Sequence, residues 1–140
     1  EHPFGVIRIH HVLEHMRDPR ATLRRLRTLL DANGHLLVGV PNYGSRSAFR
    51  LGRDWANLAI PHHINHFTQQ SLCNLLRQCG FSIVETQNRP VFEIARAAVS
   101  PRVRAIFPNA LLRYCHYLFS RARSEGENLE CWARRTDVES

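Results

Sequence analysis

The 140-residue chain contains no lysine, and all 19 of its basic residues are arginine, against 12 acidic residues. The formal net charge is therefore +7. A complete lack of lysine indicates nucleotide-composition bias in the gene as much as selection for guanidinium chemistry. The basic balance is compatible with nucleic acid, an anionic lipid surface or a phosphorylated substrate as partner, but by itself it establishes none of them.

Long apolar runs and a secretion signal are also missing. No apolar stretch is long enough to span a bilayer, and the opening residues, EHPFGVIRIH, place no basic region ahead of an apolar one. The chain does not begin with Met, so we expect it to be part of a longer protein. Its four cysteines form no CxxC pair, which favours reduced thiols and a cytoplasmic location over a disulfide framework.

The first feature that the sequence does contain is a strand–helix–strand pattern. Residues 4–9, FGVIRI, predict a short strand, and the Asp-Pro pair at 18–19 is typical of a helix start, with Asp as N-cap. Leucines then recur at helical spacing, and the Asn-Gly pair at 33–34 is expected to end the helix. The apolar run LLVGV at 36–40 predicts a strand buried on both faces, as in parallel sheets.

Polar side chains follow both of these strands. His10, His11 and Glu14 come after the first strand, and Asn42 and Tyr43 come after the second. A right-handed crossover between parallel strands places their carboxyl ends on the same edge of a sheet. Open α/β sheets bind their ligands at that edge. The sequence therefore predicts a ligand site where these two groups of residues meet.

The rest of the chain predicts two further strands and a basic segment. Residues 44–67 are expected to form a long loop, and such loops are usually functional or disordered; aromatic and histidine residues in this one argue against disorder. Residues 68–80 predict a helix capped by threonine, and residues 81–86 predict a strand. Residues 89–126 are strongly basic, with an apolar stripe typical of a helix, and residues 128–134 predict a last strand.

Two longer stretches carry a family pattern. The first, HVLEHMRDPRATLRRLRTLLDANGHLLVGVPNYGS at 11–45, has a Leu-Glu-His turn, an Asp-Pro helix start and an apolar strand that ends in Pro-Asn. The second, WANLAIPHHINHFTQQSLCNLLRQCGFSIVE at 55–85, has Pro-x-His-x-x-His-Phe-Thr followed by Ser-Leu, Leu-Leu and Gly-Phe. Together they resemble the class I S-adenosylmethionine-dependent methyltransferases, strongly over residues 4–87 and loosely over 127–135.

The resemblance implies an α/β fold: a partial Rossmann-like sheet matching strands four to seven of the family's seven, mostly parallel with an antiparallel last strand. Residues 1–140 would be one truncated methyltransferase domain, with a substrate-side loop at 44–67 and a basic helical insertion at 89–126. The family's first three strands and its Gly-rich cofactor loop have no counterpart here, and Gly5 replaces an acid. We therefore expect the isolated chain not to bind cofactor, and the strand at 4–9 to have an open edge.

The resemblance also implies a cofactor, S-adenosylmethionine, and roles for individual residues. Methyl transfer from a sulfonium is an in-line displacement in which the enzyme mainly aligns the reacting groups. A hydroxyl nucleophile is helped by a base, a role that suits neutral imidazole. The implied site residues are His10, His11 and Glu14 for the cofactor, Asn42, Tyr43 and Trp55 for the substrate, and His63 and His66 for catalysis.

Structural roles are the alternatives for several of these residues. Glu14 could hydrogen-bond the local backbone to hold the turn, and Trp55 could anchor the loop rather than stack on a substrate. A role in bridging the loop to the core suits His63 and His66 as well as catalysis does. The trio His62, His63 and His66 could also hold zinc, although we predict no metal site because other ligands are scarce nearby.

The resulting functional prediction is methyl transfer by the parent protein to a small-molecule or glycan-type acceptor. Binding of nucleic acid is not expected, and peripheral contact with a membrane through the basic segment is compatible with the charge. The oligomeric state is left open. The alternative is a non-enzymatic remnant, or an interaction module that presents a basic helix to an anionic partner.

Overall fold

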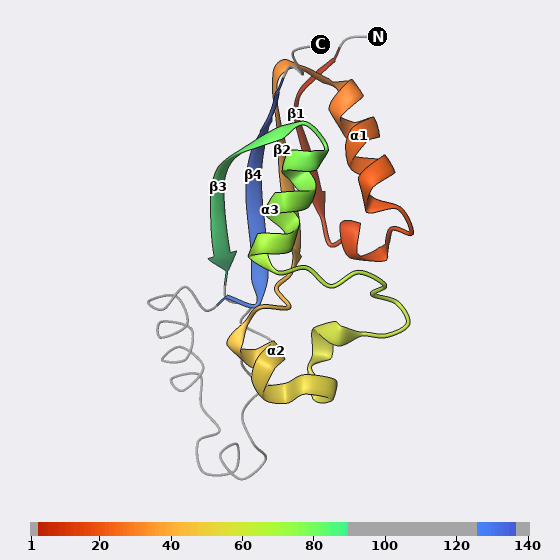
Figure 1. Ribbon diagram of the computed structural model, residues 1–140, viewed down its shortest axis with the longest axis vertical. Helices are drawn as coiled ribbons and strands as arrows, with labels where there is room; N and C mark the ends of the chain where they lie inside the picture. The colour runs from red at the N-terminus through yellow and green to blue at the C-terminus, as the bar shows by residue number, and fades with distance from the viewer. Residues whose placement is uncertain (1–2, 90–125, 137–140) are drawn as a thin grey trace.

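A computed structural model describes residues 3–89 and 126–136, which form one sheet in the order β1-β2-β4-β3 (Figure 1). β1 and β2 are parallel, whereas β4 runs antiparallel to both of its neighbours, so the first three strands share one direction. The predicted α/β fold, mostly parallel with an antiparallel last strand, is confirmed. The strands are β1 (Phe4–His10), β2 (Leu30–Pro41), β3 (Phe81–Arg89) and β4 (Asn128–Arg135).

The two longer helices begin where the sequence predicts. α1 (Pro19–Leu29) follows Asp18, whose carboxylate accepts a backbone N–H of the first turn at 2.8 Å. α3 (Gln69–Gln78) follows Thr68, and the side chains of Thr68 and Ser71 each accept the other's backbone N–H. This reciprocal capping satisfies donors that the first turn of a helix otherwise leaves unpaired.

The end of α1 differs from the prediction. The helix ends at Leu29 rather than at the Asn-Gly pair at 33–34, and β2 begins at once with Leu30. Leu30 is fully buried and pairs with Phe4 of β1, so burial in the core takes precedence over the helical spacing of the leucines. Gly34 lies inside β2, where a Cβ would come within 2.9 Å of the Leu30 side chain. This glycine therefore permits close packing and does not cap the helix.

The segment predicted as one long loop, residues 44–67, contains three short helical pieces. α2 (Arg46–Leu51) is capped by the hydroxyl of Ser45. Two 3-10 turns follow, η2 (Gly52–Asp54) and η3 (Ala56–Leu58). The segment lies beyond the carboxyl ends of β1 and β2, in the lower part of Figure 1. It therefore lies next to the strand ends where a ligand site is predicted, and its role as a substrate-side loop stays a prediction.

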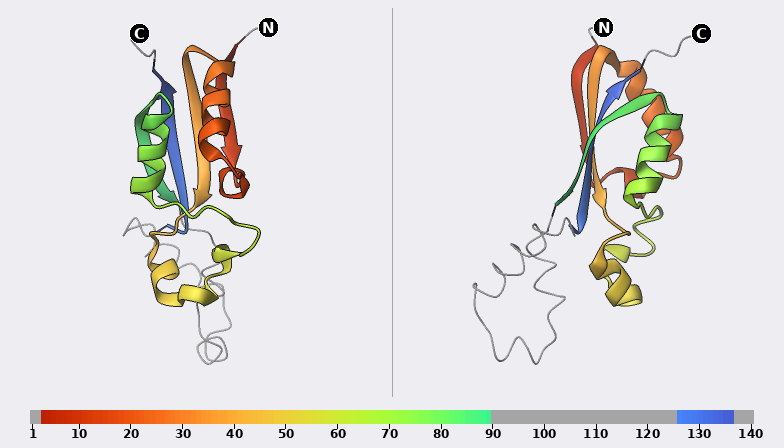
Figure 2. Two further views of the ribbon diagram at one scale, coloured as in Figure 1. Left: turned by 45° about the vertical axis from the view of Figure 1, so that its right-hand side comes forward. Right: turned by 60° about the vertical axis from the view of Figure 1, so that its left-hand side comes forward.

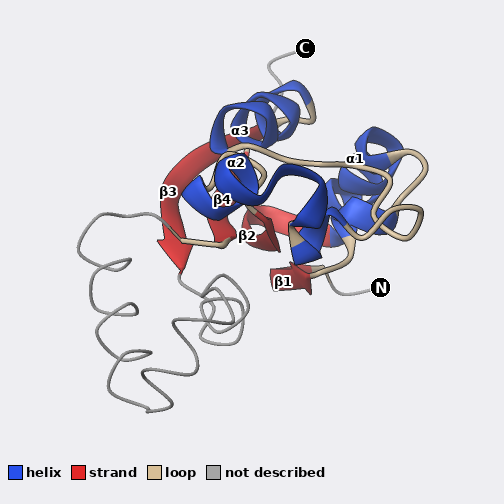
Figure 3. Cartoon of the chain, turned by 90° about the horizontal axis from the view of Figure 1, so that it is seen from below, coloured by secondary structure: helices blue, strands red, loops and turns tan. Residues whose placement is uncertain are grey.

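Both α1 and α3 pack on the same face of the sheet (Figures 2 and 3). Within residues 3–89 and 126–136 no helix covers the opposite face, and β1 pairs only with β2. The edge at β1 is thus open in the described part of the chain, as expected. The fully buried core between helices and sheet comprises Leu13, Leu23, Leu30, Leu36, Val38, Val40, Leu72, Leu76, Leu129, Cys131 and Ala133.

The three cysteines in the described residues are Cys73, Cys79 and Cys131, and all are buried and outside any disulfide with one another. Burial raises the pKa of Cys79. Burial, together with the adjacent Cys73, raises the pKa of Cys131 to about 12. Because only the thiolate is an effective nucleophile, these side chains act as small apolar groups in the core.

The predicted basic insertion at 89–126 falls almost wholly on residues 90–125, which lie outside the described residues. Its helix, and any contact it makes with a membrane or an anionic partner, therefore stay predictions. Among the helices of the described part, none is long and apolar enough to cross a membrane.

A truncation in the core tests the packing of α3. We expect Leu72→Ala to lower the free energy of unfolding by about 2–5 kcal/mol, because it opens a cavity at a fully buried position. Val84→Ala is the matched control, with an expected loss below about 1 kcal/mol at a side chain that is 57% exposed. Urea denaturation followed by circular dichroism measures both. Equal losses in the two variants would contradict this packing.

Candidate functional site

The carboxyl ends of β1 and β2 meet at one edge of the sheet, as predicted. His10, the last residue of β1, lies opposite Gly39 of β2, and the N–H of His11 donates to the carbonyl of Gly39 at 2.9 Å. The chain then forms a 3-10 turn, η1 (Leu13–His15), two of whose residues are buried. The polar turn is therefore held against the ends of both strands.

His10 occupies the space above Gly39. A Cβ at residue 39 would lie 2.2 Å from Cδ2 of the His10 ring, so the ring in this position requires a glycine beneath it. Nε2 of His10 lies 3.7 Å from Oε1 of Glu130 on β4, and Glu130 forms an ion pair with Arg89. Burial lowers the pKa of His10, with a further contribution from His11, against the attraction of Glu130. The ring is therefore neutral at neutral pH.

Glu14 is only 1% exposed and connects two parts of the site. Its Oε1 lies 3.0 Å from Nδ1 of His11. The backbone of His11 has a φ of +53°, a conformation that residues other than glycine rarely adopt. The backbone carbonyl of Glu14 accepts the N–H groups of Ile64 and Asn65, both at 3.0 Å. These bonds fasten the segment 44–67 to the turn. Oε2 of Glu14 has no hydrogen-bond partner among the described residues.

Both predicted catalytic histidines contact backbone carbonyls. Nδ1 of His63 lies 2.7 Å from the carbonyl of Asn57, and Nε2 of His66 lies 2.9 Å from the carbonyl of Leu58. A carbonyl oxygen can only accept, so each of these ring nitrogens carries a hydrogen. The other nitrogen of each neutral ring keeps its lone pair. Each histidine therefore combines an anchoring contact with a free basic nitrogen.

His15 is held in the same way as His63. Its Nδ1 lies 2.8 Å from the carbonyl of His62, which leaves its Nε2 with a lone pair. The rings of His15 and His63 pack edge to face, with 4.8 Å between their centroids. The structure therefore places His63 beside His15 and Glu14 of the η1 turn, rather than grouping it with His62 and His66.

Asn42 is buried, and its side chain is fully engaged by the fold. Nδ2 donates to Oδ1 of Asn88 at 3.2 Å and to the carbonyl of Gly126 at 3.1 Å, while Oδ1 accepts the N–H of Gly44 at 3.0 Å. The amide thus joins the ends of β2 and β3 to the segment that leads into β4. The role of Asn42 in substrate binding stays a prediction.

Tyr43 is the exposed member of an aromatic group at the end of β2, with 49% of its surface accessible. Its ring centroid lies 5.9 Å from that of Trp55 and 5.4 Å from that of His66. Trp55 is 2% exposed, and its Nε1 donates to Oε2 of the buried Glu127 at 2.9 Å. Trp55 is therefore placed as an anchor of the segment, the alternative considered from the sequence, and it supports Tyr43.

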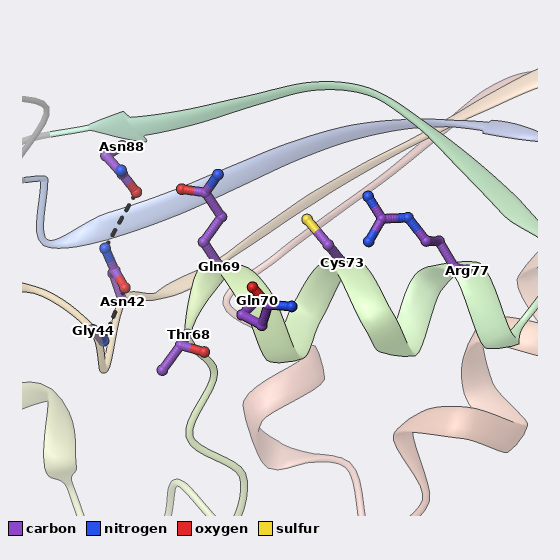
Figure 4. A pocket seen from close by; sticks show the side chains of 8 residues that line it. All are labelled: Asn42, Gly44, Thr68, Gln69, Gln70, Cys73, Arg77 and Asn88. Atoms are coloured by element: carbon purple, nitrogen blue, oxygen red, sulfur yellow. Dashed lines mark hydrogen bonds between the residues drawn. The ribbon is translucent and has the colours of Figure 1, made fainter.

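A polar groove of about 440 Å³ runs along α3, beside the ends of β2 and β3 (Figure 4). Amide side chains dominate its walls, and Arg77 supplies a positive charge at one end. Asn42 and Gly44, the sequence neighbours of Tyr43, lie at the other end of the groove. The lining residues are Asn42, Gly44, Thr68, Gln69, Gln70, Cys73, Arg77 and Asn88.

Several site residues were not identified from the sequence. Glu127 and Glu130 follow the basic segment, and Asn88 and Arg89 end β3 further along than predicted. Their positions depend on the insertion of β4 between β2 and β3, which residue spacing does not reveal. The one local signal is a pair of acidic residues at the start of the last strand, in a chain where acids are outnumbered.

A comparison with known families shows the class of protein to which this fold and polar edge belong. The sequence matches the family described as a methyltransferase domain over residues 1–86. This match covers more than half of the chain, so the chain belongs to that family. A comparison with curated proteins found no match.

Solved structures share the fold at low sequence identity. A chain of the Haloferax volcanii complex containing the Trm112 methyltransferase activator has a TM-score of 0.66 and 12% identity, covering 99% of this chain and 56% of that one. A SAM-dependent methyltransferase from Thermotoga maritima has a TM-score of 0.61 and 15% identity, and the match covers 95% of this chain and 56% of that one. A third structure is the Burkholderia thailandensis 1,6-didemethyltoxoflavin-N1-methyltransferase with bound 1,6-didemethyltoxoflavin and S-adenosylhomocysteine. It has a TM-score of 0.54 and 18% identity, and the match covers 96% of this chain and 44% of that one. The chain thus spans about half the length of these structures.

The bond between Trp55 and Glu127 can be tested by a double-mutant cycle. We expect Trp55→Phe to lower the free energy of unfolding by about 1–3 kcal/mol beyond its loss of packing, because the buried carboxylate loses its donor. In a Glu127→Gln background the uncharged acceptor is less costly to leave unpaired, so Trp55→Phe should lose less. Urea denaturation of the four proteins measures the coupling. An identical loss in both backgrounds would mean that the charge of Glu127 adds nothing to the bond.

The lowered pKa of His10 predicts a pH effect on stability. The unfolded chain, with an ordinary His10 pKa near 6.5, binds this proton more readily than the folded chain, so His10 reduces stability as the pH falls below that value. We expect His10→Gln to lose less stability than the unmodified chain between about pH 7.5 and about pH 5.5. Denaturation at each pH measures this difference, and NMR titration of the ring measures its pKa directly. A pKa above 6.5 would contradict the partial burial of the ring against Gly39.

Proposed function

We propose that this chain is the acceptor-side part of an enzyme that transfers a methyl group from S-adenosylmethionine to a small-molecule or glycan-type acceptor. The observation that carries the proposal is the meeting of the two polar strand ends, at β1 and β2, in a chain of the methyltransferase family. The Burkholderia enzyme, with S-adenosylhomocysteine bound, supports the choice of cofactor. The buried free thiols support a reducing compartment, the cytoplasm.

The cofactor side of the site is proposed to be the end of β1. His10 and His11 are exposed there, next to the carboxyl end of a parallel strand, where ligands of open α/β sheets bind. The contact between His11 and Glu14 holds the turn in its left-handed conformation. His10 and His11 would contact the cofactor, and Glu14 would support them from within.

The acceptor side is proposed to be the aromatic group at the end of β2. S-adenosylmethionine supplies an electrophilic methyl group when bound, and the residues of this chain orient the nucleophile. The exposed ring of Tyr43 offers a surface for a flat or sugar-like acceptor, and Trp55 fixes its position. His66, beside Tyr43, holds a lone pair on Nδ1 because its Nε2 is bonded to Leu58, so it would accept the acceptor's proton.

The groove along α3 supports a polar acceptor. Its amide donors and acceptors match hydroxyl groups, and Arg77 would attract a carboxylate or phosphate on the same molecule. Because Asn42 and Gly44 belong to both the groove and the neighbourhood of Tyr43, an acceptor seated on Tyr43 could extend along α3. His63 is the second candidate for the base.

A titration of the full product of the gene with S-adenosylhomocysteine tests the proposal. We expect saturable heat in the calorimeter, and about tenfold weaker binding for His10→Ala, equivalent to about 1.4 kcal/mol for one lost contact. His35→Ala is the matched control, because His35 lies at the far end of the same parallel pairing, opposite Val6. Absence of saturable binding by the full product would overturn the proposal.

The same titration with the 140-residue chain locates the cofactor site. None of the seven glycines of this chain forms a GxGxxG pattern, so we expect no saturable heat from the folded chain alone. Saturable binding here would mean that these residues are sufficient for a cofactor pocket, and would contradict the division of the site.

A further inference from the structure

We propose that Glu14, His15 and His63 form a binding site for a divalent transition-metal ion of the zinc class. One ligand atom from each of the three residues lies within 4.8 Å of the other two. Two of the residues belong to the η1 turn and the third to the segment that follows η3. The site thus bridges two segments far apart in the sequence.

The backbone holds these two segments together without help from an ion. The carbonyl of Glu14 accepts the N–H groups of Ile64 and Asn65, and the carbonyl of His62 accepts from the ring of His15. The side chain of Asn65 donates in turn to the carbonyl of Met16 at 2.6 Å. A site whose ligands are already positioned by the fold loses little conformational entropy on binding.

Both imidazoles are oriented as metal ligands usually are. A metal-bound histidine almost always donates its other ring N–H to a carbonyl or carboxylate, which fixes the tautomer and the direction of the lone pair. His15 and His63 each direct Nδ1–H to a backbone carbonyl, at 2.8 and 2.7 Å. In each ring Nε2 is therefore the nitrogen with a lone pair available to an ion.

Glu14 supplies a second, independent observation. Its carboxylate is 1% exposed, and Oε2 has no partner among the described residues. A buried carboxylate oxygen without a donor is unfavourable, because it has lost its water and gained nothing in return. A cation bound at Oε2 would remove this penalty.

The other oxygen of Glu14 is held by a chain of two hydrogen bonds. Nδ2 of Asn128 lies 3.4 Å from Nε2 of His11, and Nδ1 of His11 lies 3.0 Å from Oε1 of Glu14. If the amide nitrogen donates to Nε2, the hydrogen of the neutral ring sits on Nδ1 and points at the carboxylate. Carboxylate ligands of metal ions are commonly fixed by such outer hydrogen bonds.

The donor set selects the class of ion. Two imidazole nitrogens and one carboxylate oxygen suit zinc and its neighbours in the first transition row, whereas magnesium and calcium prefer oxygen ligands throughout. Three protein ligands leave one position of a tetrahedral ion open. Because His15 is exposed, water or an anionic oxygen of a small molecule can reach that position. Glu14 also supports the proposed cofactor contacts, and His63 is the second candidate base. Binding of Co²⁺ is measured without cofactor or acceptor, so failure of this site is distinguishable from failure of the proposed function.

Titration of the 140-residue chain with Co²⁺, followed by visible absorption, tests the site directly. Cobalt is the probe because its absorption reports the number and geometry of its ligands, and Zn²⁺ should then displace it. We expect one tightly bound ion per chain, and affinity reduced by more than about 100-fold in Glu14→Gln and in His63→Asn, beyond the loss typical of outer hydrogen-bonding partners. His62→Asn is the matched control, because it changes an exposed neighbouring ring but keeps the carbonyl that holds His15.

A measurement on the unmodified chain guards against variants that fail to fold. In ¹⁵N spectra of the histidine rings, Zn²⁺ should shift Nε2 of His15 and His63 while their Nδ1 atoms stay protonated. Lack of saturable cobalt binding would overturn the proposal. Equal affinity in His63→Asn and His62→Asn, or zinc shifts confined to other histidines, would do so as well.

Discussion

The parallel pairing of β1 with β2 is the constraint on which the arrangement of the site depends. Parallel neighbours require a crossover, which α1 provides, and the crossover makes both strands end at the same edge. An antiparallel pair would place His11 and Asn42 at opposite ends of the sheet. The insertion of β4 then adds the start of an antiparallel strand to that edge, so that Glu127 and Glu130 join residues from much earlier in the chain.

The burial of Glu14 is what fixes the histidine-rich segment relative to this edge. Ordering a segment such as 44–67 is opposed by about 1–2 kcal/mol of backbone entropy per residue, so it must gain contacts along its length. It gains them near its middle from the bond between Trp55 and Glu127, and near its end from the carbonyl of Glu14. The backbone of Glu14 thus helps to position His63, and its carboxylate belongs to the same proposed metal site as the His63 ring. A substitution of Glu14 is therefore expected to affect the packing of the segment as well as the binding of an ion.

Local signals in the sequence were sufficient for the layout of the fold. The Asp-Pro pair and Thr68 are caps that act within one turn. The unbroken apolar run at 36–40 identified β2 but predicted a strand covered on both faces, whereas the helices of the described residues cover one face. Local signals failed where a distant partner decided the outcome. Leu30 fits a helical stripe, but pairing with Phe4 places it in β2. The sequence suggested either substrate binding or loop anchoring for Trp55, and its hydrogen bond to Glu127, far along the chain, favours anchoring.

The candidate site shows the same division between local and distant effects. The polar edge was predictable, because it requires only two parallel strands and the residues that follow them. The individual roles were not, because they depend on which ring nitrogen meets a carbonyl, and that is set by tertiary contacts with residues such as Asn57 and Leu58. No spacing of histidines in the sequence carries this information.

Those contacts also mean that structural and chemical roles of the histidines are not alternatives. A ring that gives one N–H to the backbone is held in place, and the same bond determines which nitrogen keeps its lone pair. What the second nitrogen can reach then decides the chemistry. His66 lies beside the exposed Tyr43, where an acceptor proton would be released, whereas His15 and His63 lie beside the buried carboxylate of Glu14. One histidine-rich stretch can therefore serve a base on one side and a cation on the other.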